Sequence, residues 1–213
     1  MFKRVDFLYI GIIIILIFGS GVSLGLNYDF LRKEFLERET KSLELQIKDF
    51  IVSNELIKNV SSENCHPFQS YLNDIAKQSE DLGESLLSFE SKGFSQAKDY
   101  DILRSSYFLQ EVQYWMNTEK YRVCNPNIAT ILFFYSNNDD SKKQGYVLTK
   151  LREEKLGTVY IFNFDVDEKN INTVKLLKSI YNITTSPSLV LNSGKLVEGF
   201  VDLDSLKENI KLK

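Results

Sequence analysis

Apolar residues fill one uninterrupted stretch near the start of the chain, and this stretch predicts a transmembrane helix. Residues 7–26 carry no charge and follow a short tail, residues 1–6, that contains Lys3, Arg4 and Asp6. At 1.5 Å of rise per residue, a helix of this length spans about 30 Å, the thickness of the hydrocarbon core of a bilayer. A cleaved signal peptide is the alternative, but its apolar core is usually shorter and no clear small-residue cleavage site follows. We therefore expect an uncleaved membrane anchor.

Apolar residues then recur at helical spacing through residues 27–123, which predicts a helical region. The first part, residues 28–58, is free of proline and glycine. Two further amphipathic helices are expected at about 65–93 and 95–120. Because only a short Ser-Lys-Gly link joins them, we expect an antiparallel helical hairpin. Its aromatic residues keep the helical register, which favours a packed core over a ligand cage.

From residue 124 to the end, 124–213, strand and helix patterns alternate, as in an α/β domain. The expected strands are 129–136, 158–164, 188–192 and 195–200, and the expected helices are 141–154, 168–181 and 203–211. The apolar residues expected on the buried side of the helix at 168–181 are Val174, Leu176, Leu177 and Ile180.

Charge and composition exclude several classes of function. The net charge of −3 is spread without a basic patch, which argues against a nucleic-acid partner. His66 is the only histidine, and with two cysteines it gives too few ligands for a zinc site. The chain also contains no glycine-rich phosphate loop of the Walker type. We expect neither a metal nor a small-molecule cofactor.

The two cysteines flank the expected hairpin. Cys65 lies just before its first helix and Cys124 just after its second, so an antiparallel arrangement brings them together. A disulfide here would contribute roughly 4 kcal/mol by the chain-entropy model. The alternative is a redox-active pair, because Cys65 precedes a helix and has His66 beside it. Reactive pairs are usually closely spaced, which favours the structural interpretation.

The flanking charges and the cysteines bear on location. Lys3 and Arg4 favour an N-terminus on the inside, and an even pair of cysteines favours an oxidising compartment for the bulk of the chain. We expect a single-pass protein of the cell membrane with its C-terminal domain extracytoplasmic.

Gly21 and Gly25 form a small-xxx-small pair, which lets two membrane helices approach closely, although glycine is common in such helices generally. Homodimerisation through this pair is a hypothesis.

The order of elements from about residue 129 resembles that of the thioredoxin family. The segment YNITTSPSLVLNSGKLVEGF at 181–200 resembles the family's cis-proline, its next strand, a glycine turn and the last strand. The segment FFYSNNDDSKKQG at 133–145 resembles the first strand and the active-site loop, and FNFDVDEKN at 162–170 resembles the second strand and its turn. This resemblance covers about 129–213. It implies an α/β fold with a central mixed sheet flanked by helices.

The resemblance assigns Asn138 and Ser141 to the positions of the two reactive cysteines, and Pro187 to the cis-proline. Neither Asn nor Ser can supply the thiolate that thiol–disulfide exchange requires. The fold also implies a groove, which in redox-active relatives receives an extended peptide. In this chain the groove would be bordered by Asn138, Asp139, Asp140, Ser141, Ser186 and Pro187.

These features predict a membrane-anchored, thioredoxin-like protein without redox catalysis. It would serve as a non-catalytic binding or structural module facing the extracytoplasmic side, with a bilayer around 7–26 and an unidentified protein or peptide partner. The alternative is an oxidoreductase-related protein that uses Cys65 and Cys124 as its redox pair. In a third hypothesis, the helical region scaffolds a membrane partner. No catalytic residue is expected in the thioredoxin-like half, which contains no Cys or His beyond Cys124.

Overall fold

The protein is described from a computed structural model that divides into two units, residues 1–52 and 53–213, each considered by itself. The described residues are 13–26, 41, 45, 48, 49, 51–53, 55, 65–91 and 98–210.

The first unit contains a helix at residues 13–26. Among the described residues, no helix combines the length and the apolar character needed to cross a membrane. The prediction of a transmembrane helix at 7–26 is therefore contradicted. Its first part, residues 7–12, lies outside the described residues, as does the tail at 1–6.

Gly21 and Gly25 both lie on this helix, and no atom comes within 4 Å of the place that a Cβ would take at either glycine. The hypothesis of a homodimer through this pair stays a prediction. Most of the helix expected at 28–58 falls outside the described residues, apart from isolated helical positions between 41 and 55.

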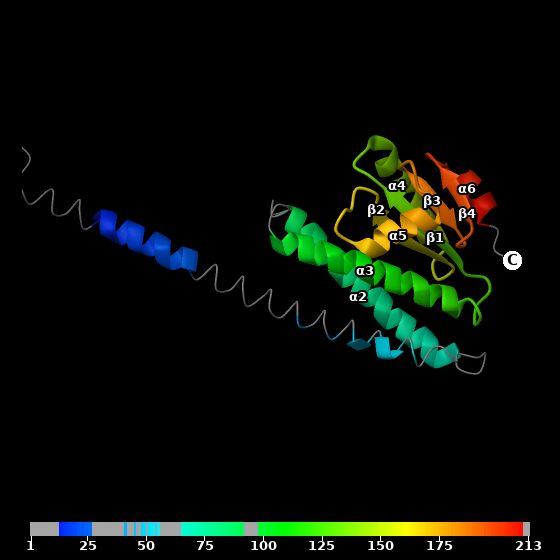
Figure 1. Cartoon of the computed structure of the whole chain (residues 1–213), viewed down its shortest axis with the longest axis horizontal. Helices are drawn as coiled ribbons and strands as arrows, with labels where there is room; N and C mark the ends of the chain where they lie inside the picture. Colours follow the sequence, from blue (N-terminus) through cyan, green and yellow to red (C-terminus); the bar gives the residue numbers. More distant parts are fainter. Residues whose placement is uncertain are drawn as a thin grey trace, which may run out of the picture. The chain divides into compact units, whose positions relative to one another are not determined.

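The second unit begins with two long helices, α2 (Cys65–Ser91) and α3 (Lys98–Tyr121), which lie side by side below the sheet in Figure 1. Pro67 lies in the first turn of α2, where its missing N–H would have no partner anyway. On its other side α3 packs against the sheet through Phe108 and Val112. Because α3 is covered on two sides, it also buries polar residues, namely Gln110, Glu111, Asn117 and Thr118.

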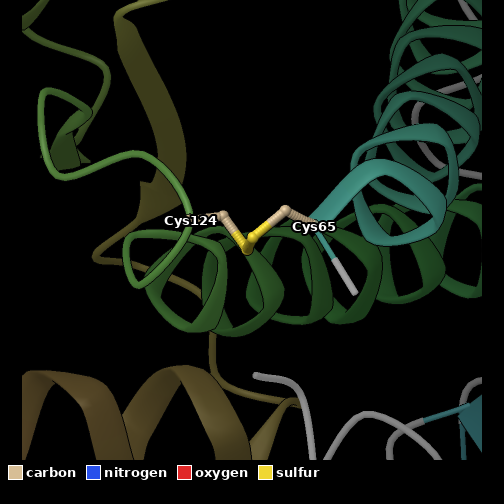
Figure 2. Close-up of a disulfide and its surroundings, with 2 residues drawn as sticks. All are labelled: Cys65 and Cys124. Carbon is tan, nitrogen blue, oxygen red and sulfur yellow. A yellow bond between two sulfur atoms is a disulfide. The ribbon is translucent and has the colours of Figure 1, made fainter. Parts of the chain in front are cut away.

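Cys65 and Cys124 form a disulfide, with their Cα atoms 5.5 Å apart and a sequence separation of 59. Figure 2 shows the bond joining the first turn of α2 to the segment that follows α3. The disulfide predicted from the hairpin is therefore confirmed. Beside it, Phe68 and Leu72 of α2 pack against Tyr121 and Ile128 in a small apolar cluster.

The sheet has four strands in the order β2-β1-β3-β4. The strands are β1 (Ala129–Tyr135), β2 (Val159–Asp165), β3 (Ser188–Leu191) and β4 (Lys195–Glu198). β1 pairs parallel with β2 and antiparallel with β3, and β3 pairs antiparallel with β4. The mixed sheet implied by the family resemblance is therefore confirmed.

Helices cover both faces of this sheet. Successive residues of a strand point to opposite faces, so neighbouring residues of β1 contact different helices. Leu132 and Phe134 of β1 pack with α3 and with α5 (Asn172–Ile180). Ile131 and Phe133 pack on the other face with α4 (Asp139–Glu154) and α6 (Leu203–Asn209). The core thus consists of two apolar layers, one on each side of the sheet.

Two helices start at places that differ from the prediction. α4 begins at Asp139 rather than at 141, because Asn138 caps it. α5 begins at Asn172 rather than at 168, because the side chain of Glu168 accepts a hydrogen bond from Asn170 N at 2.6 Å and Ile171 keeps an extended backbone. The residues before α5 therefore form a turn.

The expected buried side of α5 was partly wrong. Val174 and Leu177 are buried against the sheet, whereas Leu176 and Ile180 are 59% and 57% exposed. The last two residues are one turn apart and lie on the outer face of a short helix. An apolar residue in a short helix therefore need not face the core.

Candidate functional site

The loop between β1 and α4 contains the two positions that the resemblance assigned to reactive cysteines. Asn138, in extended conformation, is the N-cap of α4, and its Oδ1 accepts a hydrogen bond from Ser141 N at 2.7 Å. Asparagine is among the preferred residues at this position because its side chain satisfies a free N–H of the first turn. Asp139 and Asp140 follow in that turn, where the helix dipole favours negative charge. Both are exposed, and Asp140 pairs with Lys143 at 3.2 Å.

The amide group of Asn138 also joins this loop to the turn before β3. Its Nδ2 donates to Ser136 Oγ at 2.8 Å and to both the carbonyl oxygen and Oγ of Ser186 at 3.2 Å. The hydroxyls of Ser136 and Ser186 are 2.6 Å apart, and Ser136 N donates to Ser141 Oγ at 3.2 Å. We call these four residues, Ser136, Asn138, Ser141 and Ser186, the loop network.

The structure therefore brings together three of the predicted site residues and leaves the others beside them. Asn138 bonds directly to Ser186 and also to Ser141, so the two sides of the expected groove touch at Asn138. Pro187 follows the network as a buried residue in a cis peptide bond, and Asp139 and Asp140 take no part in it. Sequence reasoning missed Ser136, although a serine that ends a strand of apolar residues was a usable signal.

The loop network is neutral and satisfies its own hydrogen-bonding groups. It contains hydroxyls and one amide but no thiol, imidazole or carboxylate. Among the described residues, no group of three or more His, Cys, Asp or Glu side chains is arranged to hold a metal ion. The network can therefore position backbone, but it offers neither a nucleophile with an adjacent base nor a metal centre.

A buried carboxylate lies on α3, where sequence reasoning predicted only core. Glu111 is 5% exposed and accepts hydrogen bonds from Ser79 Oγ of α2 and from Asn163 N of β2, the latter at 2.9 Å. Burial raises its pKa to about 7, while the two hydrogen bonds and the charge of Arg152 partly offset this effect by stabilising the charged form. Glu111 thus links α2, α3 and the sheet through one ionisable group.

A second polar link ties the start of α3 to the end of β2. Arg104 forms ion pairs with Asp165 and with the buried carboxylate of Glu168, the latter at 3.1 Å, and its guanidinium lies 5.6 Å from the ring centre of Phe108. Arg104 lies 61 positions before Asp165, so no spacing rule in the sequence indicates this cluster. The contacts of this cluster join packed elements, so we assign it a structural role.

Two adjoining pockets open between α4 and β2 and share Lys142 and Asn163 on their walls. The outer pocket, of about 390 Å³, runs along α4 as far as Arg152. The inner pocket, of about 300 Å³, lies against β1 and ends at Ser136 and Ser141 of the loop network. Together we call them the α4–β2 groove. None of its residues was predicted as a site apart from Ser141.

The disulfide lies at the opposite end of the sheet from the loop network. Cys124 precedes β1, whereas Ser136 and Asn138 follow it. With about 3.3 Å of rise per residue, a strand of this length separates its two ends by about 20 Å. The two predicted sites, the cysteine pair and the degenerate loop, are therefore separate places in the fold.

Comparisons with known proteins find similarity only among solved structures. No protein-family model and no curated protein matches the chain. A chloroplastic thioredoxin z is 20% identical, with a TM-score of 0.35, over 44% of this chain and 84% of its own. Thioredoxin-2 of the malaria parasite is 21% identical, with a TM-score of 0.33, over 39% and 82%. A further malarial protein is 18% identical, with a TM-score of 0.34, over 39% and 94%. With TM-scores below 0.5, these matches carry no argument about the function of this chain.

Proposed function

We propose that this chain is a thioredoxin-related protein without thiol–disulfide exchange chemistry, serving as a non-catalytic binding or structural module. The loop network is the single observation that carries the proposal. Asn138 and Ser141 stand where the resemblance places the reactive cysteines, and both are engaged in hydrogen bonds that fix the loop. Neither side chain yields a thiolate.

The network also supports a structural role for the loop. The Nδ2 atom of Asn138 donates to the carbonyl oxygen of Ser186, so this backbone acceptor is already occupied from within the chain. An extended peptide that approached between Asn138 and Ser186 would have to displace these hydrogen bonds. We therefore assign the loop to holding β1, α4 and the turn before β3 together.

The disulfide supports the location that the sequence favoured. Disulfides persist in oxidising compartments and are rare where thiol reductants are abundant. We propose that the second unit folds on the extracytoplasmic side. Thiol trapping in native membranes and soluble fractions tests this location: a blocked Cys65–Cys124 pair is expected, whereas two free thiols would contradict it.

The decisive experiment measures disulfide reduction by the purified full-length protein. We expect no acceleration of insulin reduction by dithiothreitol over the rate without protein, because the loop has no thiolate. The Cys65→Ser/Cys124→Ser variant is the matched control. Catalysis by both proteins would overturn the proposal outright, because the loop would then have an activity that its residues do not provide.

The alternative function, a redox pair formed by Cys65 and Cys124, rests on a specific observation. Cys65 is the first residue of α2, where a helix N-terminus favours a thiolate, and both cysteines are half-exposed. Catalysis by the wild type that disappears in the double serine variant would favour this alternative. A reduction potential below about −300 mV would instead identify the bond as structural.

A further inference from the structure

The α4–β2 groove has the dimensions of a ligand site. Its two pockets, of about 390 and 300 Å³, adjoin at Lys142 and Asn163. Sites for small molecules usually measure roughly 300–1,000 Å³. From Lys142 to Arg152, α4 lines the groove for about 15 Å at 1.5 Å of rise per residue. This length accommodates a small organic molecule.

The outer pocket carries unpaired positive charge. Lys142 and Arg152 line it, and neither forms an ion pair with another residue of the part of the chain that the structure describes. No carboxylate lines either pocket. The buried carboxylate of Glu111, which accepts hydrogen bonds from Ser79 and Asn163, interacts electrostatically with Arg152 but forms no ion pair with it among the described residues. A concave surface with two unpaired cations attracts an anionic group.

The inner pocket is aromatic. The side chains of Tyr107, Phe133 and Tyr135 line it, and Ser136 and Ser141 close its far end. Rings in this arrangement favour a flat apolar body, which they contact with face or edge. The groove thus changes along its length from an aromatic end to a cationic end, a pattern that fits an amphiphilic ligand.

Gly145 adds an independent observation. It lies inside α4, on the wall of the outer pocket, and apart from its chain neighbours and the backbone of its own helix no atom comes within 4 Å of the place that its Cβ would take. Glycine in a helix interior costs about 1 kcal/mol relative to alanine. No packing neighbour requires glycine at this position, and the absence of a side chain leaves the outer pocket open.

We propose that the α4–β2 groove binds a small organic anion, with a flat apolar body in the inner pocket and its anionic group in the outer pocket, where Lys142 and Arg152 supply positive charge. The site goes beyond the proposed function, because it involves no thiol chemistry and leaves the loop network intact. An assay of disulfide reduction and an assay of binding in this groove can therefore fail independently.

The test uses 1-naphthyl phosphate as the probe, with inorganic phosphate and 1-naphthol as its two separate parts. Each is titrated into purified full-length protein by calorimetry and by amide chemical-shift mapping. We expect the naphthyl phosphate to bind more tightly than either part, with the largest shifts at Gly145, Thr149, Ile161 and Asn163. Shifts confined to another surface would overturn the proposal.

Three variants sharpen the test. Lys142→Gln/Arg152→Gln should weaken binding about tenfold, which corresponds to about 1.4 kcal/mol. Lys150→Gln/Lys155→Gln removes the same charge from exposed positions outside the groove and should leave binding within about twofold. Gly145→Leu fills the outer pocket and should abolish binding, while its circular dichroism spectrum and melting curve report on folding.

The results separate cleanly. Equal weakening by the two charge variants would show a non-specific effect of net charge and would overturn the assignment of Lys142 and Arg152. Equal affinity for 1-naphthol and 1-naphthyl phosphate would overturn the anionic part of the ligand. Unchanged binding to folded Gly145→Leu would place the probe elsewhere.

Discussion

The two ends of β1 are held by opposite kinds of interaction. At the amino end, one covalent bond between Cys65 and Cys124 closes the helical hairpin. At the carboxyl end, several weak hydrogen bonds around Asn138 fix the loop to Ser186. The disulfide acts mainly by restricting the unfolded chain, whereas the loop network acts only in the folded state. The amino end of β1 is therefore sensitive to reductant, and the carboxyl end is sensitive to substitution of a single side chain.

The largest expected effect is at the disulfide. Cys65→Ser/Cys124→Ser should lower the free energy of unfolding by about 4 kcal/mol, because a closed loop of this length removes much entropy from the unfolded chain. Urea denaturation with and without reductant measures the change. The reduced wild type should match the double variant, and a loss well below 1 kcal/mol would show that packing, rather than the covalent bond, holds this end.

Glu111 supplies a pH dependence that neither end of β1 has. Its pKa is raised from 4.5 to about 7, so the folded protein binds more protons than the unfolded chain between these values. Stability should therefore fall as pH rises from about 4.5 to 7, by about 3 kcal/mol, and then level off. Glu111→Gln should remove this slope and be more stable than the wild type at pH 8. Parallel pH profiles for both proteins would contradict the assignment.

At the loop end, Asn138→Ala should cost about 2 kcal/mol, because it removes the helix cap and the hydrogen bonds to Ser136 and Ser186. Asn138→Ser keeps a capping oxygen and should recover about half of this loss. The neighbouring Asn137 is exposed, and Asn137→Ala should change stability by less than about 0.5 kcal/mol. Combined with the cysteine variant, the Asn138 effect should add, since the two ends lie about 20 Å apart.

The smallest effect is expected from surface ion pairs, one near each end. Arg122 pairs with Glu119 beside the disulfide, and Lys143 pairs with Asp140 beside the loop. Arg122→Gln and Lys143→Gln should each change stability by less than about 0.5 kcal/mol, and salt should reduce the change further. Thermal melting at low and high salt measures both. A larger loss of stability in either variant would show that the ion pair at that end contributes in addition to the disulfide or the loop network.

The local patterns were enough for most elements of the second unit. Strand β1 is largely apolar and buried on both faces, and helix α2 carries a clear apolar stripe, so their places followed from the sequence. The disulfide followed from the hairpin in the same way. The start of α5 did not, because Glu168 is held before the helix by an ion pair with Arg104, which is distant in the sequence.

The site was less predictable than the fold. Asn138 and Ser141 could be singled out from the resemblance, but the hydrogen bonds to Ser186 join residues 48 positions apart. The α4–β2 groove combines a helix face, an edge strand and Tyr107 of α3, and no local pattern connects them. The transmembrane prediction relied on the length of an apolar run, and among the described residues no helix is long and apolar enough to cross a membrane.

The contact between Glu111 and Asn163 also limits how this protein can associate. β2 is an edge strand, and free N–H groups along such an edge can pair with a strand of another chain. At Asn163 the buried carboxylate of α3 already occupies the N–H, so an incoming strand could not pair there without first displacing the helix. The opposite edge is β4, a strand of four residues with Lys195 and Glu198 at its ends. Addition of a strand at the β2 edge is thus blocked by a helix, and at the β4 edge only a short strand with charged ends is available for pairing.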